Sequence, residues 1–393
     1  MDLMDTDWEA LTQEEIKRYV EEHGTSRIKE FFKTKLERWR EVEVNIAITG
    51  DSGVGKSSLI NAMRELRDDD EGAAEVGITE TTREPKAYDH PTNPKIKFWD
   101  LPGIGTPNYA DMATYCKKVE LERFHAFLIL TAGRLTENDL KLAWRTSSIN
   151  KKFFLIRTKI DENVRAGRRK RSFNEEDMLQ KIRSDCCENL GDLLSDVRDI
   201  FLISNHDRDK WDFARLLQAI LNALPTYQRE TLVLSLGNAV TNDIFQKKVE
   251  VLRGRIWKVA TLSAAVAFFP IPGLSIAVDV GLILNEFTLY RSQLDLPEKG
   301  TADFEKLRVT TQDAVGKVSI TTAAQLAAYL SVFATESAAE EAVSYIPIVG
   351  SVIASTISFT ITYAALQQCL KAVEETALLV MKEAAVEANE EFD

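Results

Sequence analysis

The stretch Gly50-Asp51-Ser52-Gly53-Val54-Gly55-Lys56-Ser57 decides the fold of this chain. It matches the pattern G-x-x-x-x-G-K-[ST], directly follows a β-rich run over 44–49 and precedes a helical pattern over 57–67, which is the context that gives the pattern its meaning. Glycines let successive backbone N–H groups turn inward around phosphate oxygens, and the following helix adds its positive dipole end. We therefore predict a phosphate-binding loop, in which Lys56 reaches the β- and γ-phosphates and the Ser57 hydroxyl is a ligand of Mg²⁺.

A second motif, Asp-Leu-Pro-Gly at 100–103, ends the apolar strand pattern over 96–100. After a phosphate-binding loop, a carboxylate at Asp100 can hold the Mg²⁺ shell, and Gly103 can offer its backbone N–H to the γ-phosphate. Between the two motifs lies the segment 77–84, which reads Gly-Ile-Thr-Glu-Thr-Thr-Arg-Glu. A switch threonine in this segment would contact Mg²⁺ when the γ-phosphate is bound, and Thr79, Thr81 and Thr82 all qualify by position.

The third motif, Thr158-Lys159-Ile160-Asp161, follows the strand pattern over 153–157 and matches [NT]-K-x-D. The Asp161 carboxylate can accept hydrogen bonds from N1 and N2 of guanine, a donor pair that adenine lacks, so we predict guanine specificity. Lys159 can lie along the plane of the base, while Thr158 stands where asparagine is commoner. Ser204 and Asn205, after the apolar run 200–203, form a weaker candidate contact to the base.

Strand and helix patterns alternate between residues 41 and 227, and the strands are continuously apolar. This alternation predicts an α/β domain, a P-loop Ras-like G domain with a mainly parallel sheet and helices on both faces. Residues 228–393 show helical patterns only, and residues 1–40 predict helices that pack on that part. We expect the two segments to form one all-α domain.

Composition limits the partners and the compartment. The chain has 393 residues and a formal net charge of −12, which disfavours general binding of nucleic acid. Its four cysteines show no metal-ligand spacing, so a reduced, cytoplasmic location is expected.

Two long uncharged segments, 259–278 and 342–370, lie within the predicted apolar hairpins 259–287 and 342–370. Both reach the roughly 20 residues that a spanning helix needs, but each contains proline and glycine. Three interpretations stay open: buried helices of an all-α domain, reversible or peripheral membrane attachment, and spanning hairpins. In the last case the nucleotide-binding domain would regulate a membrane-embedded helical bundle.

The residue after Gly103 is Ile104, not the water-positioning glutamine of Ras-like proteins, so a monomer is expected to hydrolyse GTP poorly. An alternative is a nucleotide-gated membrane scaffold with negligible hydrolysis. Charged residues that could act across an assembly include Arg83, Glu84 and the basic segment 165–171. The basic segment can also be a solvated loop, a contact to anionic lipid or a partner, or a nuclear localisation signal.

Several stretches together resemble the immunity-related, interferon-inducible GTPases of vertebrates. These are residues 50–58, of which Ser58 is the last, and residues 71–77, 98–105, 157–161 and 202–205. The likeness extends to the N-terminal helices and to residues 255–257. The resemblance implies GTP and GDP as substrate and product with Mg²⁺, and Thr82 as the switch threonine. It also implies dynamin-like self-assembly through the G domains, action at intracellular membranes of the vacuole, endoplasmic reticulum or Golgi type, and a role in cell-autonomous innate defence.

Overall fold

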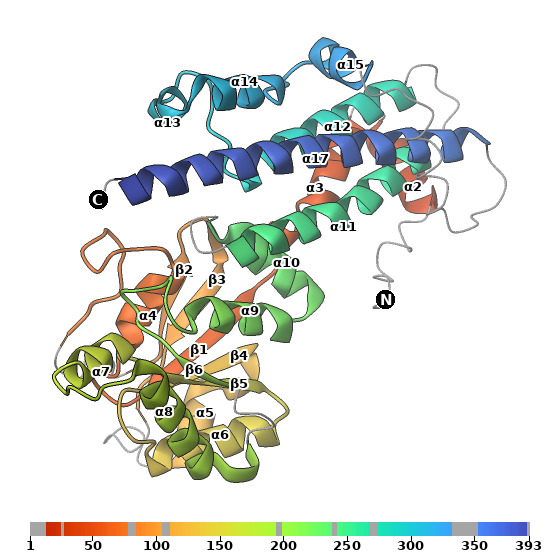
Figure 1. Cartoon of the computed structure of the whole chain (residues 1–393). Helices are drawn as coiled ribbons and strands as arrows, with labels where there is room; N and C mark the ends of the chain where they lie inside the picture. Colours follow the sequence, from red (N-terminus) through yellow and green to blue (C-terminus); the bar gives the residue numbers. More distant parts are fainter. Residues whose placement is uncertain are drawn as a thin grey trace. The chain divides into compact units, whose positions relative to one another are not determined.

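The computed structural model describes residues 13–24, 27–77, 84–103, 111–193, 199–237, 242–266, 274–331 and 353–390 (Figure 1). The chain divides into two compact units. One comprises Met1–Arg38 with Phe245–Asp393, and the other comprises Trp39–Ile244. The second unit continues past Tyr227, where the sequence placed its end, because helix α10 (Thr226–Ser235) contacts strands β1 and β3 of its sheet.

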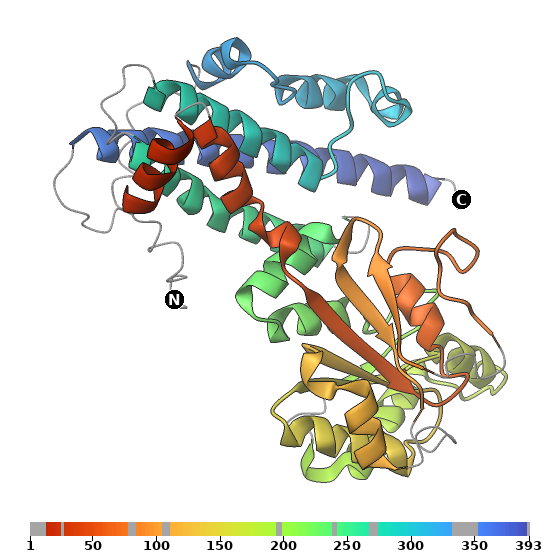
Figure 2. The same ribbon diagram turned by 180° about the vertical axis from the view of Figure 1, so that it is seen from behind.

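The second unit is built on a six-stranded sheet in the order β2-β3-β1-β4-β5-β6 (Figures 1 and 2). The strands are β1 Val44–Gly50, β2 Lys86–His90, β3 Asn93–Asp100, β4 Ala126–Thr131, β5 Lys152–Arg157 and β6 Ile200–Leu202. All neighbours are parallel except β2 and β3. The predicted fold class, a mainly parallel α/β domain beside an all-helical part, is confirmed.

Strand β2 was not predicted from the sequence. Its residues read Lys-Ala-Tyr-Asp-His, with a mostly exposed or half-buried pattern, so it lacks the apolar run that marks the other strands. It forms because it pairs antiparallel with β3 through a short turn, and such an edge strand can stay polar on its outer side.

Helices cover both faces of the sheet. They are α4 Lys56–Met63, α5 Met112–Val119, α6 Glu137–Ser148, α7 Ile160–Gly167, α8 Glu175–Leu190, α9 Phe213–Ala223 and α10. Buried residues of α5, α6, α7 and α8 share one core with alternate strand residues such as Phe127 and Ile129. The intervening strand residues, such as Leu128, are equally buried. Helices α4, α9 and α10 contact the sheet as well.

The other unit is entirely helical over its described residues. Its helices are α2 Gln13–His23, α3 Ile28–Leu36, α11 Asn242–Val266, α12 Leu274–Gln293, α13 Ala302–Lys306, α14 Val309–Lys317, α15 Ala323–Ser331 and α17 Ile353–Glu390. Helix α12 lies along α17 and contacts α3. The described part of the second uncharged segment, 353–370, and the residues after it up to Glu390 belong to one helix, α17.

The two predicted hairpins are only partly covered by the description. Their proline–glycine breaks at 270–273 and 347–350 lie outside the described residues. Within the described part, no helix combines the length and apolar character that crossing a membrane requires. The uncharged parts of α11 and α17 meet instead at a buried polar cluster, in which Ser263 contacts Ser358 and Thr362 through hydroxyl groups.

Candidate nucleotide site

The loop between β1 and α4 has the backbone that the glycine pattern predicts. Gly50, Gly53 and Gly55 all have positive φ, at 140°, 76° and 93°, a region that favours glycine. A Cβ on Gly50 would lie 2.2 Å from the carbonyl oxygen of Leu130. The loop therefore needs glycine at this position for space as well as for conformation, and Gly55 serves as the N-cap of α4.

The Lys56 ammonium lies over the loop, where its Nζ donates to the carbonyl oxygens of Gly50 at 2.9 Å and Asp51 at 3.1 Å. A carboxyl that the sequence analysis did not single out is nearby. Asp139, in the first turn of α6, is buried, and burial, with the charge of Asp51, raises its pKa against hydrogen bonds from Thr136 and the charge of Lys56. The sequence alone does not mark Asp139 as a site residue, because an aspartate three residues after Thr136 is also what an ordinary helix capping box contains.

Thr158 connects the end of β5 to the phosphate loop. Its hydroxyl, fully buried, donates to the carbonyl oxygen of Val54 at 2.6 Å and lies 3.3 Å from that of Thr131. A threonine in place of the commoner asparagine thus still ties the guanine motif to the loop. Lys159 follows in the left-handed conformation, at φ 59°, and is the N-cap of α7.

Asp161 lies in the first turn of α7, half-buried. The neighbouring residue Ile160 donates its backbone N–H to the carbonyl oxygen of Ile203, at 3.2 Å. This bond places the guanine motif directly beside the segment that follows β6. Lys159 is 3.9 Å from Glu162.

Ser204 and Asn205 occupy that segment, Ser204 with local hydrogen bonds and Asn205 with a long-range one. The Ser204 hydroxyl oxygen accepts from the backbone N–H groups of His206 and Asp207, at 3.2 and 3.3 Å. Asn205 donates from Nδ2 to the carbonyl oxygen of Gly55, at 3.0 Å. Of these two residues with a weak sequence signal, Asn205 makes a direct contact to the phosphate loop.

Asp100 ends β3 and pairs in register with Ile48 of β1, just before the phosphate loop. It is 2% exposed. Ser57 lies in the first turn of α4, and Gly103 follows Asp100 without regular structure. The switch candidates Thr79, Thr81 and Thr82, together with Arg83 and Ile104, lie outside the described residues.

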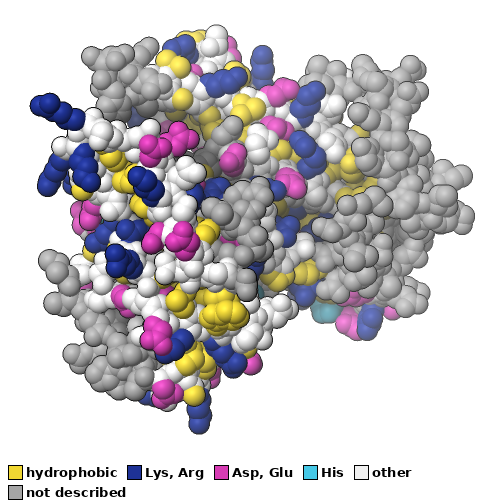
Figure 3. All heavy atoms as spheres, turned by 60° about the horizontal axis from the view of Figure 1, so that its bottom comes forward, with side chains coloured by type: hydrophobic (Ala, Val, Ile, Leu, Met, Phe, Trp, Pro, Cys, Tyr) yellow, Lys and Arg dark blue, Asp and Glu magenta, His cyan; other side chains and the backbone are white. Residues whose placement is uncertain are grey.

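The basic residues of the segment 165–171 are exposed at the end of α7 and in the turn that follows. Arg168 forms an ion pair with Glu175 at 3.6 Å. Figure 3 shows basic and acidic side chains interspersed on the face it draws, with lysine and arginine side chains projecting at its left edge.

The predicted motifs therefore meet at one edge of the sheet, where the parallel strands β1, β3, β5 and β6 have their carboxyl ends. This is where open α/β sheets bind ligands. A phosphate loop tied by Thr158 and Asn205 to a guanine motif defines the class of P-loop GTPase domains.

Comparison with known proteins narrows that class. The model of the family described as Interferon-inducible GTPase (IIGP) matches residues 10–383, and the chain belongs to this family. It is 34% identical over 369 residues to interferon-inducible GTPase 5 of Rattus norvegicus, covering 90% of this chain and 77% of that one. It is also 34% identical to interferon-inducible GTPase 1 of Mus musculus, covering 65% and 62%. The resemblance stated from the sequence motifs is confirmed, and the chain is a GTPase by family.

Proposed function

We propose that the edge formed by the phosphate loop, Asp161 and Asn205 binds GTP and GDP, and that the protein hydrolyses GTP. The observation that carries this proposal is the direct hydrogen bonding of Thr158 and Asn205 to the phosphate loop, which joins base and phosphate recognition in one site. The phosphates would lie against residues 50–58 and the Lys56 ammonium. The base would lie between Lys159, Asp161 and the Ser204–Asn205 turn.

The same edge fits a magnesium ion. Mg²⁺ prefers oxygen ligands, and the described donors are the Ser57 hydroxyl, in the first turn of α4, and the buried Asp100 carboxylate, at the end of β3. Thr82 is proposed as a third contributor on the strength of the family pattern alone. When bound, the ion supplies neutralisation of the charge on the β- and γ-phosphates.

Hydrolysis is proposed to depend on self-assembly, because the residue after Gly103 is Ile104 rather than a water-positioning glutamine. The test is GTP turnover per molecule at increasing protein concentration, with Lys56→Ala as the control. We expect turnover per molecule to rise with concentration and to be lost in Lys56→Ala. A constant turnover per molecule would rule out stimulation by assembly, and intact GTP binding with no turnover would favour the nucleotide-gated scaffold.

We further propose that the protein acts at intracellular membranes in cell-autonomous defence. Support comes from the two long uncharged segments of the sequence, 259–278 and 342–370, and from relatives whose names call them interferon-inducible. Flotation of the purified protein with liposomes in its GTP- and GDP-bound states tests the membrane step. Recovery of the protein only in the unbound fraction, in both states, would contradict it.

A further inference from the structure

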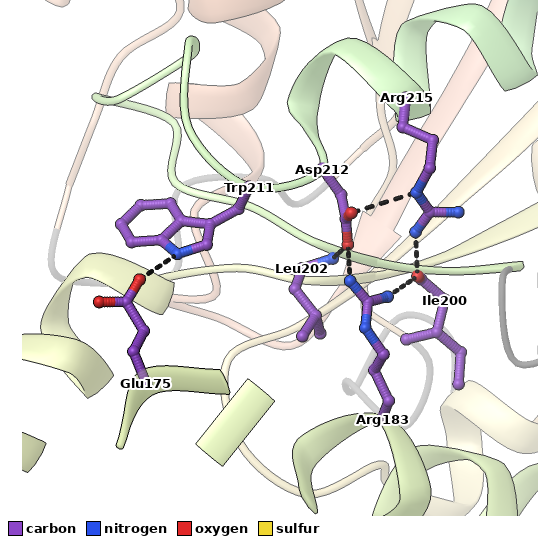
Figure 4. A network of polar contacts seen from close by, with 7 residues as sticks. All are labelled: Glu175, Arg183, Ile200, Leu202, Trp211, Asp212 and Arg215. Atoms are coloured by element: carbon purple, nitrogen blue, oxygen red, sulfur yellow. Dashed lines mark hydrogen bonds and ion pairs between the residues drawn. The ribbon is translucent and has the colours of Figure 1, made fainter. Parts of the chain in front are cut away.

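The segment 203–211, which we call the base loop, follows β6 and carries Ser204 and Asn205. Asp212, directly after the loop, is hydrogen-bonded to Leu202, directly before it (Figure 4). The Asp212 carboxylate accepts the backbone N–H of Leu202 at 2.8 Å, and the Asp212 backbone N–H donates to the carbonyl oxygen of Leu202 at 2.9 Å. These two bonds join the residue before the base loop to the residue after it. The two ends of the base loop are therefore held together at the end of β6.

The carboxylate of Asp212 is itself held by two arginines. Arg183 Nη2 lies 2.5 Å from Oδ2, and Arg215 Nε lies 3.1 Å from Oδ1. Both guanidinium groups also donate to the carbonyl oxygen of Ile200, at 2.8 and 2.6 Å. Planar guanidinium groups with several fixed donors suit such shared recognition.

The charge state of Asp212 suits this role. Burial alone would raise the pKa of the carboxyl, but the hydrogen bonds from Arg215 and Leu202 and the charges of Arg183 and Arg215 outweigh it, and the pKa lies below its usual value. Asp212 precedes α9 in the N-cap position, yet its side chain makes no capping hydrogen bond. It turns back to β6 instead, so helix capping does not explain the residue.

The base loop contacts both ends of the phosphate-loop helix. Asn205 donates to the carbonyl oxygen of Gly55, before α4, and Arg208 Nη1 donates to that of Ala62 at 3.1 Å, in its last turn. At the other end of the loop, Trp211 takes the left-handed conformation at φ 54° and donates from Nε1 to Glu175 at 3.0 Å. The base loop can hold Asn205 on the phosphate loop only while the hydrogen bonds between Leu202 and Asp212 keep its two ends together.

We propose that Asp212 is a positioning residue for guanine-nucleotide binding, which clamps the base loop so that Asn205 stays against the phosphate loop and the Ser204 turn stays beside it. The inference rests on the proposed function of this site. It differs from a purely structural role, the protection of the edge strand β6, because a positioning role affects how long a bound nucleotide stays in place. The placement of interacting groups matters steeply: in catalysis, a misplacement of about 1 Å can cost on the order of a hundredfold in rate.

The test measures the dissociation rate of a fluorescent GDP analogue from the full chain, at a temperature where circular dichroism shows each variant folded. Asp212→Asn keeps the shape but removes the charge that both arginines recognise. We expect it to release GDP at least about tenfold faster. The control is Glu188→Gln, the same carboxylate-to-amide change at an exposed position of α8, for which we expect the wild-type rate.

Arg183→Gln is the second variant, since it removes one arm of the clamp and serves if Asp212→Asn does not fold. It should accelerate release in the same direction, and the two changes combined should be less than additive, because they break one network. A folded Asp212→Asn protein with the wild-type release rate would overturn the clamp alone. A wild-type protein that binds no guanine nucleotide would overturn the proposed function and the clamp with it.

Discussion

At the scale of single residues, a change from glycine to alanine is expected to have opposite effects in the phosphate loop and in helix α11. In Gly50→Ala the new methyl group would meet the Leu130 carbonyl oxygen at 2.2 Å, at a φ of 140°. We expect loss of nucleotide binding and a lower melting temperature, since backbone on the neighbouring strand cannot give way. Gly254→Ala is the matched control, because that glycine lies within α11 with no atom within 4 Å of the added carbon.

Gly254→Ala should raise stability by about 0.5–1 kcal/mol, because alanine restricts the unfolded chain and favours helix. Melting curves and a titration with a fluorescent GDP analogue check both variants. Wild-type binding by Gly50→Ala would show that the loop can adopt another backbone. An unstable Gly254→Ala would mean that this face of α11 is not open.

Thr158 marks how far residue-level prediction could go. The motif spacing predicted a guanine-binding turn, but threonine in place of asparagine left one contact undecided. Its hydroxyl proves to donate to the carbonyl oxygen of Val54. That partner is distant in sequence and depends on the register of β1, β4 and β5, which no local pattern specifies. Asp139 was not predicted as a site residue either, because its nearness to the phosphate loop follows from the path of α6.

At the scale of elements, the hairpin of β2 and β3 carries a buried histidine. His90 is 3% exposed, and its Nδ1 accepts from the backbone N–H of Thr92 at 3.3 Å. Burial, assisted by the charge of Arg64, lowers the pKa of His90 from 6.5 to about 4. The folded state thus holds the neutral ring, while the unfolded state takes up a proton below pH 6.5.

This difference predicts that stability rises with pH between about 4 and 6.5. His90 should contribute up to about 3 kcal/mol that is fully present above pH 6.5 and is lost as the pH falls toward 4. Denaturant titrations at several pH values measure the slope. In His90→Gln the slope should become shallower but not vanish, because burial also lowers the pKa of His125. His23→Gln, the same substitution at an exposed position of α2, is the matched control.

The elements that the sequence predicted are those with strong apolar periodicity. The strand patterns over 44–49, 96–100, 153–157 and 200–203 match β1, β3, β5 and β6, and the helical pattern over 57–67 overlaps α4. Strand β2 and the short helix α7 were missed, since the first is stabilised by pairing with β3 and the second by the burial of Ile160 and Val164. In both cases a tertiary contact outweighs a weak local pattern.

At the scale of the whole molecule, both units bury apolar side chains, and the helical unit also buries an ion pair. Arg255 of α11 is 2% exposed and Glu286 of α12 is fully buried. The guanidinium meets the carboxylate at 2.7 Å and 3.2 Å and donates from Nη1 to the carbonyl oxygen of Leu36, at the end of α3.

This arrangement connects α3, near the start of the sequence, with α11 and α12, which lie far from it along the chain. Its loss should therefore affect the helical unit as a whole. In Glu286→Gln the buried Arg255 charge loses its counter-ion, and we expect a loss of about 3–5 kcal/mol in the free energy of unfolding. The control is Asp303→Asn, whose exposed pair with Lys306 should contribute less than about 1 kcal/mol. Replacing both buried partners, as Arg255→Met with Glu286→Leu, should cost less than Glu286→Gln alone, because no buried charge is left uncompensated. Chemical denaturation followed by circular dichroism measures all three, and a double variant less stable than the single one would show that the hydrogen bond to Leu36, rather than charge pairing, joins α3 to this unit.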